Sequence, residues 1–458
     1  MVPEIGPTHW VYLIGVIAVV VAMILRRGVV LIASLGIFVI ALVFTGGDLI
    51  TSVQKVFAAF MEAGTDLFDI MLVIALMVGM LKTMESMGSD YLMVAPIKKL
   101  LQNPTSAFFI LGVIMYVCAL FFWPTPATAL VGVILVPVAV KAGMPAMAAA
   151  MTVNILGHGM ALSGDMVLQG APAITSGAAD VPIEGILSSG AILSLTAGIV
   201  AIVIAFFMVR KELKEGKGAE QSTLTEAQPR ESYTGGSRFI AVAVPVVFIT
   251  MVIFMAATGI RGGAATSLLG GAAAIFIIVG SLISHGHNAL EKAGEYIKEG
   301  LMFAIKIFAV VIPIAGFFFL GAPGPAEAIL GEGAPGLLFD MGEAFAAALP
   351  LSKIPVAFGI VVTGVVTGLD GSGFSGLPLV GSLARALGGP MGINIPTLAA
   401  LGQIGAIYSG GGTLTAWAFG LVATAGVAGV SPLDLARKNF IPVASGLFVA
   451  TILAIIMM

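Results

Sequence analysis

Apolar stretches long enough to cross a lipid bilayer recur along the whole chain, and they limit what it can fold into. They occur near 10–25, 28–45, 67–86, 186–209, 239–259, 264–285, 301–321 and 433–458. The hydrocarbon core of a bilayer is about 30 Å thick, and a helix needs about 20 apolar residues to span it. We therefore expect an all-α membrane protein, because helices satisfy their backbone hydrogen bonds without water.

The composition supports lipid as the main solvent. Only 10% of the 458 residues are charged, whereas soluble domains carry about 25%. The 59 glycines and 23 prolines lie mostly within apolar runs, as is typical of membrane helices. Residues 1–9 contain no Lys or Arg, so we expect the first apolar run to remain as a helix and not to be cleaved as a signal peptide.

The two halves of the chain have similar layouts. Each contains two spans, an amphipathic segment expected as an interfacial helix (50–63 or 287–300), a third span, a polar interval, a region interrupted by Pro and Gly, and a last span. Five crossings per half is an odd number, so the second half would run in the opposite direction. We predict inverted repeats at 1–210 and 239–458, joined by a polar cytoplasmic linker at 211–238.

Each interrupted region is predicted to hold one re-entrant hairpin and one broken helix. The hairpins are 105–140 and 353–388, with polar tips at 123–126 and 369–373. Their second arms of about 14 residues would reach roughly 21 Å, which is short for a crossing. The broken helices that follow are predicted at 145–170 and 395–428.

The basic residues set the expected orientation. If Met1 is outside the cell membrane, most of the 21 Lys and Arg fall at or near the cytoplasmic side, and only Lys55, Arg261, Lys353 and Arg385 fall outside. This is the direction of the positive-inside rule. We expect both termini to be extracytoplasmic and the linker cytoplasmic. No basic cluster is typical of nucleic-acid binding.

Small polar residues and glycines gather at the tips and in the broken helices, where inverted-repeat transporters bind substrate and coupling ions. The residues predicted to contact substrate are Thr125, Pro126, Thr128, Asn154, His158, Ser372, Gly373, Ser375, Ser409, Gly410 and Thr413. Those predicted to bind or couple a cation are Asp370, Gly371, Asp165, Ser163, Gln403 and Tyr408. Close helix packing is the alternative explanation for the Ser, Thr and Gly clusters.

Two titratable residues stand out. Asp370 is a carboxylate at expected membrane depth, where charges are costly and usually functional, although an N-cap role is the alternative. His158 lies between two glycines and could bind substrate, carry a proton or be structural. Na⁺ at the hairpin tips is possible. No transition metal or organic cofactor is expected.

The chain resembles members of the ion transporter superfamily, which includes gluconate, citrate and C4-dicarboxylate permeases. The resemblance covers nearly the whole length through the paired halves, hairpins and linker. The tips Pro124-Thr125-Pro126-Ala127-Thr128 and Asp370-Gly371-Ser372-Gly373 take the place of a Ser-Asn-Thr type signature, without its asparagine. The resemblance implies a mobile transport domain, a scaffold that is often dimeric, and elevator-like movement.

We therefore expect a Na⁺- or H⁺-coupled symporter for a small organic anion. Two transport alternatives are a cation/proton antiporter and the large membrane subunit of a binding-protein-dependent transporter. An intramembrane Ser-His-Asp enzyme and a purely structural membrane protein are less favoured. The phosphate-binding loop G-x-x-x-x-G-K-[ST] and the H-E-x-x-H and G-x-S-x-G motifs do not occur, so we do not expect an enzyme or an ATP-driven pump.

Overall fold

The computed structural model describes residues 3–25, 27–215, 232–260, 262–348, 352–371 and 373–458. Throughout these ranges the chain forms helices and connecting turns, with no β-strand. Eight helices in the described part are long and apolar enough to cross a membrane, or up to nine if one bent pair counts as a span. The all-α expectation is confirmed. Inverted repeats and re-entrant hairpins stay predictions.

The first three helices form one side of the molecule: α1 (Pro7–Ile24), α2 (Val30–Phe44) and α3 (Leu49–Met87). At 1.5 Å per residue, the 39 residues of α3 extend roughly 60 Å. The predicted amphipathic segment 50–63 is therefore not a separate interfacial helix. It continues without a break into the span predicted at 67–86, because nothing between them, not even the single Gly64, ends the helix.

Several further helices pack with these three. The short α4 (Ser89–Val94) and 3₁₀ helix η1 (Ala95–Leu100) occupy the polar interval of the first half. Those of the second half are α12 (Gly235–Thr258), α13 (Gly262–His285), the 3₁₀ turn η5 (Gly286–Asn288), α14 (Ala289–Phe308), α15 (Val311–Phe319), α16 (Pro323–Leu330) and α17 (Leu337–Ala348). We call α1–α4, η1 and α12–α17 the frame.

The prediction of one continuous helix at 301–321 was wrong. Helix α14 ends at Phe308, α15 begins at Val311, and α16 turns by 104° from α15. The predicted linker 211–238 is also shorter than expected, because α11 continues to Glu215 and α12 already begins at Gly235. Its residues 216–231 lie outside the described part.

The remaining helices form two core segments, each followed by a long helix. The first core segment, residues 104–179, contains α5 (Pro104–Phe122), α6 (Pro124–Ala127), the π-helical η2 (Thr128–Gly132), α7 (Val133–Lys141), α8 (Ala146–Val153), the π-helical η3 (Asn154–Ala161), α9 (Leu162–Gly164) and α10 (Gly170–Ala179). Helix α11 (Ile183–Glu215) follows it.

The second core segment, residues 353–428, has a similar order. It contains α18 (Lys353–Thr367), the 3₁₀ turn η6 (Gly368–Asp370), α19 (Leu377–Gly388), α20 (Ile395–Ala406), the π-helical η7 (Ile407–Thr413) and α21 (Phe419–Ala428). Helix α22 (Pro432–Met457) follows it and packs along α11.

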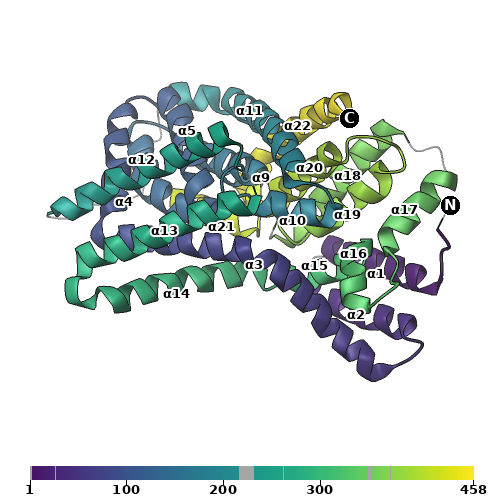
Figure 1. The fold of residues 1–458 in the computed structure, drawn as a ribbon. Helices are drawn as coiled ribbons and strands as arrows, with labels where there is room; N and C mark the ends of the chain where they lie inside the picture. Colours follow the sequence, from purple (N-terminus) through teal and green to yellow (C-terminus); the bar gives the residue numbers. More distant parts are fainter. Residues whose placement is uncertain (1–2, 26, 216–231, 261, 349–351, 372) are drawn as a thin grey trace.

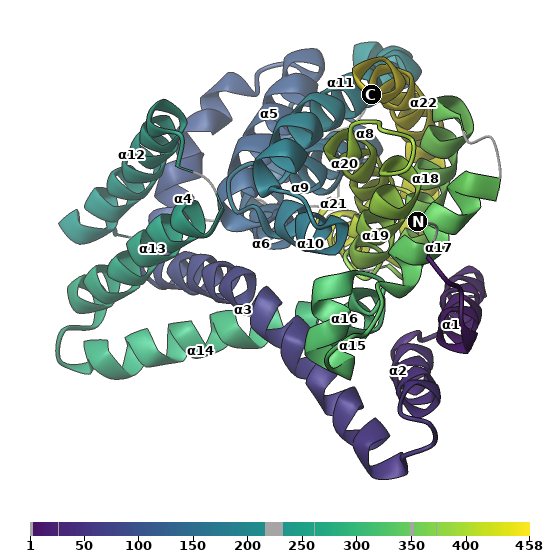
Figure 2. The same cartoon turned by 45° about the vertical axis from the view of Figure 1, so that its right-hand side comes forward.

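The two core segments lie together, and the frame lies beside them. In Figure 1, α3, α13 and α14 run along the lower side of the molecule, below the helices of the core segments. The turned view in Figure 2 keeps α12, α13 and α14 on one side of the core segments and α1, α2 and α15 on another. Both chain ends are on the right of Figure 1, whereas α12 begins on the left.

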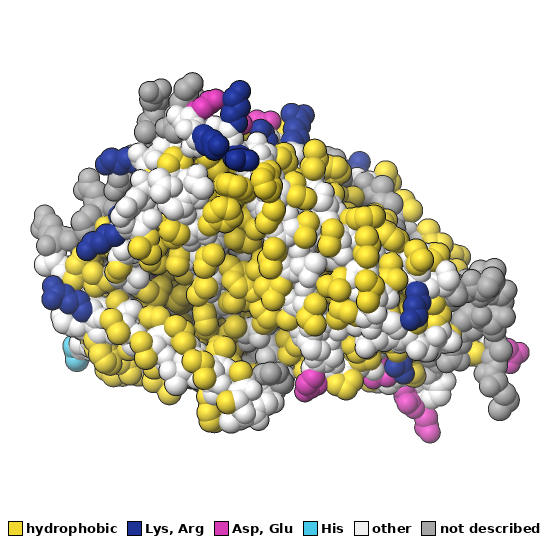
Figure 3. Space-filling model, turned by 90° about the horizontal axis from the view of Figure 1, so that it is seen from above, with side chains coloured by type: hydrophobic (Ala, Val, Ile, Leu, Met, Phe, Trp, Pro, Cys, Tyr) yellow, Lys and Arg dark blue, Asp and Glu magenta, His cyan; other side chains and the backbone are white. Residues whose placement is uncertain are grey.

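The outer surface matches a lipid environment. Figure 3 shows apolar side chains over the middle of one face, with the charged side chains toward its margins. Large apolar residues that are more than half exposed include Ile14, Leu31, Phe239 and Ile253. Such an area is too extensive for a monomer in water.

Candidate functional site

The tip of the first predicted hairpin is a sharp turn at Trp123, between α5 and α6. Its φ is +67°, which is unusual for a bulky residue, and Pro124 begins α6 immediately after it. The Trp123 ring is buried and lies 5.3 Å, centroid to centroid, from the ring of Phe374, the residue after the second tip. The two tips therefore meet through aromatic side chains.

The first tip also contacts a π-helical segment of its own core segment. Thr125 Oγ1 lies 3.4 Å from His158 Nε2 in η3. The His158 ring is fully buried and packs edge-on against Phe419, the first residue of α21. Its Nδ1 has no hydrogen-bond partner among the described residues, so a buried polar atom is available to a ligand or a water.

The two π-helical segments η3 and η7 are joined by an amide network. The Asn154 Nδ2 atom donates to the Gly412 carbonyl at 2.6 Å. Asn439 of α22 donates to Asn154 Oδ1 at 2.8 Å and to the Thr413 carbonyl at 3.2 Å. All of these residues are buried. The network holds carbonyl groups that an ordinary α-helix would bond internally, because a π-helix and the turn after it change that pattern.

The tip of the second predicted hairpin meets η7 backbone to backbone. A Cβ added to Gly410 would lie 2.5 Å from the Gly373 nitrogen and 2.6 Å from the Gly368 oxygen. Gly373 itself has φ +73°, which favours glycine. Trp417 also donates from Nε1 to the Leu369 carbonyl at 2.9 Å. Only glycine at these positions lets the tip approach so closely.

A second polar cluster lies beside this network. Gln403 donates from Nε2 to the Ser163 carbonyl at 2.9 Å, and its Oε1 has no partner in the described part. The Tyr408 hydroxyl donates to the Ser194 carbonyl at 3.5 Å. All four residues are buried. This cluster joins α20 and η7 to α9 and α11, so it links the two halves of the chain again.

The first broken helix is interrupted later than predicted. Asn154, His158 and Ser163 lie within a continuous helix, α8–η3–α9, and the break spans 165–169. Asp165 and Gln169 have φ values of +36° and +63°, both rare for residues other than glycine. The helix resumes as α10 at Gly170 and so extends beyond the predicted end at 170.

Asp165 binds the beginning of α10. Its Oδ2 accepts a hydrogen bond from the Ala171 nitrogen at 2.9 Å, and its side chain is buried. The first turn of a helix exposes unpaired N–H groups and a partial positive charge. The Asp165 carboxylate accepts a hydrogen bond from one of these N–H groups, and its negative charge is stabilised by the positive end of the helix dipole.

The second broken helix lacks an equivalent acid within its break. Gln403, Tyr408, Ser409 and Thr413 lie in α20 and η7, before the break at 414–418, which contains no Asp or Glu. Helix α21 then begins at Phe419, beside His158: a Cβ added to Gly420 would collide with the His158 ring. The N–H groups at the beginning of α21 thus lie next to a histidine with an unpartnered nitrogen.

The other predicted residues are placed as follows. Thr128 donates to the Pro124 carbonyl at 2.8 Å, and Thr413 donates to the Tyr408 carbonyl, so both hydroxyls bond within their own helices. Ser409 lies 3.4 Å from Thr415, hydroxyl to hydroxyl. Pro126 is half-buried, and Ser375 and Gly371 are buried. Only the backbone of Asp370 is described, and Ser372 lies outside the described residues.

Sequence reasoning missed Asn439 and Thr424. Thr424 Oγ1 lies 3.4 Å from Asn154 Nδ2, and Asn439 binds the same amide group. The signal for Asn439 was present, because an amide within the apolar run 433–458 must find a partner inside the protein. No cluster of three or more His, Cys, Asp or Glu suited to a metal ion occurs in the part of the chain that the structure describes.

Comparison with known proteins places the chain in a family. No family model matches it. The uncharacterized membrane protein YhfA of Bacillus subtilis (strain 168) is 37% identical over 465 residues, which cover 99% of this chain and all of that protein. The chain belongs to the YhfA family. It is a membrane protein with multiple apolar helices.

Two solved structures share the fold of this YhfA family member. The Alcanivorax borkumensis YdaH transporter has a TM-score of 0.55 at 17% identity, with 88% of both chains covered. Neisseria gonorrhoeae MtrF, described within a class of antimetabolite efflux pumps, has a TM-score of 0.51 at 14% identity, with 88% of this chain and 84% of MtrF covered. Neither is described as a member of the ion transporter superfamily, so that finer assignment stays a prediction.

Proposed function

We propose that this protein is a cation-coupled secondary transporter for a small organic anion. The observation that carries the proposal is the beginning of α21, where Ala418 and Gly420 are buried and the Gly420 backbone lies against the His158 ring, whose Nδ1 has no partner in the described part. The fold, shared with two transporters, supports movement of a solute. Helix N-termini bind carboxylates and phosphates through free N–H groups and the helix dipole.

The anion would be a carboxylate bound at α21. Asp165 occupies the corresponding place at α10 within the protein itself, so a carboxylate from the substrate suits α21 by the same chemistry. None of the predicted substrate residues is Lys or Arg. Recognition would therefore rest on backbone N–H groups, Thr125, His158 and the hydroxyls of η7.

The cation would bind close to the anion. Asp370 is at the second tip, and its neighbour Gly371 packs against Ala418, the residue before α21. An Asp370 carboxylate and nearby backbone carbonyls would give the oxygen ligands that Na⁺ requires, or Asp165 and Asp370 would carry protons. In this proposal the two core segments move together against the frame in an elevator-like cycle, as a homodimer, with both termini extracytoplasmic.

The test is uptake of radiolabelled hydroxy- and dicarboxylates into liposomes that contain the purified protein. A Na⁺ or proton gradient should drive accumulation of at least one carboxylate, and dissipating the gradient should abolish it. If no carboxylate moves under either gradient, the symport proposal is wrong.

Antiport is the second candidate, because His158 and Asp165 are titratable groups buried in the core and MtrF belongs to a class of efflux pumps. An antiporter would exchange protons for Na⁺, or for the organic anion, in the same liposomes. A pH-sensitive dye trapped inside would distinguish it from a symporter by the direction of proton movement. Dependence on a separate binding protein would show as transport only after that protein is added.

A further inference from the structure

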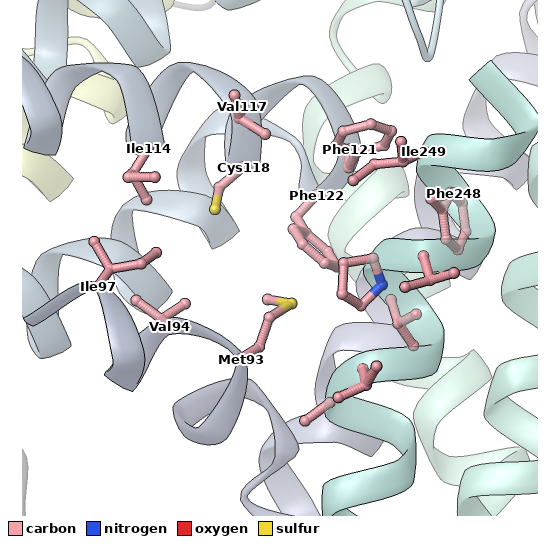
Figure 4. A pocket seen from close by; sticks show the side chains of 15 residues that line it. Met93, Val94, Ile97, Ile114, Val117, Cys118, Phe121, Phe122, Phe248 and Ile249 are labelled. Atoms are coloured by element: carbon pink, nitrogen blue, oxygen red, sulfur yellow. The ribbon is translucent and has the colours of Figure 1, made fainter. Parts of the chain in front are cut away.

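A groove between the frame and the first core segment has no role in the proposed transport site. It encloses about 330 Å³, within the range of small-molecule sites. Helices α4, η1, α5 and α12 form its walls. Figure 4 shows the Met93 and Cys118 side chains pointing into the space, with Phe122 and Phe248 at one end. All of its lining side chains are apolar, so it suits a hydrocarbon chain.

Three basic residues neighbour the groove lining along the chain. Lys98 and Lys99 directly follow the lining residue Ile97. On α12, Arg238 comes one turn before the lining residue Val242 and shares a helix face with it. Among the described residues, none of these three cations pairs with a carboxylate. Lys98 instead donates to the Tyr91 hydroxyl at 3.1 Å.

The length of the groove matches one leaflet. From Arg238 to the lining residue Ile249 is 11 residues of helix, or roughly 16 Å. Half of the hydrocarbon core of a bilayer is about 15 Å. A chain lying in the groove would therefore reach from the headgroup level, at the basic end, to the middle of the membrane at Phe121 and Phe248.

We propose that this groove binds one acyl chain of an anionic membrane phospholipid, whose phosphate is held by Lys98, Lys99 and Arg238. Basic pockets between membrane helices are a known basis for anionic headgroup recognition. Because α5 belongs to the first core segment and α12 to the frame, the lipid contacts both parts. This inference does not depend on the identity of the transported solute.

Native mass spectrometry of the purified, delipidated protein tests the site, with phosphatidylglycerol and phosphatidylcholine as probes. The protein should prefer phosphatidylglycerol. Each of the single variants should reduce that preference by about fivefold: Lys98→Gln, Lys99→Gln and Arg238→Gln. A basic residue near the membrane surface contributes about 1 kcal/mol to binding of an anionic lipid, which corresponds to a factor of about five in affinity. Equal binding of both lipids, or a triple variant with unchanged preference, would overturn the headgroup assignment.

A matched pair of variants tests whether the acyl chain of the lipid lies in the groove. Val117→Trp fills the groove and should abolish retention of phosphatidylglycerol. Val113→Trp, one turn earlier on the same helix, exposed and outside the groove, should retain it. If Val117→Trp binds lipid as wild type does, or if both variants lose it equally, the groove is not the site.

The wild-type chain offers a readout that needs no variant. Cys118 is its single cysteine and lines the groove. Phosphatidylglycerol should slow alkylation of Cys118 by N-ethylmaleimide several-fold, and phosphatidylcholine should slow it less. An alkylation rate that is the same with and without phosphatidylglycerol would contradict the proposal even if a tryptophan variant failed to fold.

Discussion

The breaks in the two core segments differ in what meets the helix that follows. At 165–169 the chain turns through two left-handed residues, and the Asp165 carboxylate binds the first turn of α10. At 414–418 there is no acid, and α21 begins beside the His158 ring of the other segment. One helix N-terminus is thus satisfied by the protein, whereas the other faces buried polar groups.

The tips differ in a corresponding way. The first tip turns at Trp123 and packs with aromatic rings, whereas the second turns at Gly371 and Gly373 and packs its backbone onto η7. The first tip therefore meets its surroundings through the Trp123 ring, whereas the second tip meets η7 through backbone groups. In the proposed transport site the anion would be held mainly by the second segment and its helix α21.

The largest effect is expected where the second tip touches η7. Gly410→Ala places a methyl group against the backbone of Gly368 and Gly373, and overpacking of this kind costs about 1–3 kcal/mol. We expect complete loss of transport and a lower Tm. Gly426→Ala on α21, where nothing lies within 4 Å of the added methyl, is the control and should behave as wild type. Normal transport by Gly410→Ala would show that the close approach is dispensable.

Supplying α21 with its own acid should erase the difference between the breaks. Ala418 has φ −66° and ψ 143°, a geometry suited to an N-cap residue. In Ala418→Asp the new carboxylate would repel a substrate carboxylate about 4 Å away by roughly 4 kcal/mol. Substrate affinity measured by binding should therefore fall by more than about 100-fold.

Ala418→Asn is the matched variant, because it has the same shape without the charge. It should weaken substrate binding less than Ala418→Asp does. If both substitutions have equal effects, steric exclusion and not charge explains the loss, and the anion is not held by the helix N-terminus.

Removing the acid from the first break tests whether Asp165 also couples the cation. Asp165→Asn keeps an acceptor for the Ala171 N–H but removes the charge, whereas Asp165→Ala also loses this hydrogen bond, at about 0.5–1.5 kcal/mol. We expect Asp165→Asn to fold normally and to lower gradient-driven accumulation by about tenfold. Unchanged accumulation in liposomes would assign Asp165 a structural role only.

The smallest effect is expected at His158. His158→Gln retains one hydrogen-bonding group toward Thr125, so the loss is one hydrogen bond, about 0.5–1.5 kcal/mol. The substrate KM should rise by about two- to tenfold. His285→Gln, whose side chain contacts Tyr296 outside the core, should leave KM unchanged. An equal change in both variants would remove His158 from the site.

Much of the helical framework could be predicted from the sequence. The run 264–285 lies within α13, and the run 239–259 extends only one residue beyond the end of α12, because uninterrupted apolar stretches of this length form one helix. The range 353–388 begins with the first residue of α18 and ends with the last residue of α19. The Gly and Pro clusters of the second half coincide with short helices, since α18 has 15 residues and α19 has 12. In the first half Pro104–Phe122, Pro124–Lys141 and Ala146–Gly164 are each long enough to cross a membrane, so the clusters there did not predict helix length.

The details of the site could not be predicted, because tertiary contacts decide them. The π-helical segments at 154–161 and 407–413 depend on bonds between distant residues, such as that of Asn154 to Gly412. Left-handed backbone at Asp165 and Gln169 has no local sequence signal comparable to glycine. The continuity of α3 was missed because a polar pattern in its first part suggested an interfacial helix.

The most direct test of the anion site is a thermal-shift titration with carboxylates and their uncharged amides, with Na⁺ present. Ligand that binds only the folded protein raises Tm with concentration. We predict that a carboxylate stabilises the wild type and Asp165→Asn, that its amide does not, and that Ala418→Asp loses the effect. If the carboxylate stabilises Ala418→Asp as strongly as the wild type, the anion does not bind at the beginning of α21.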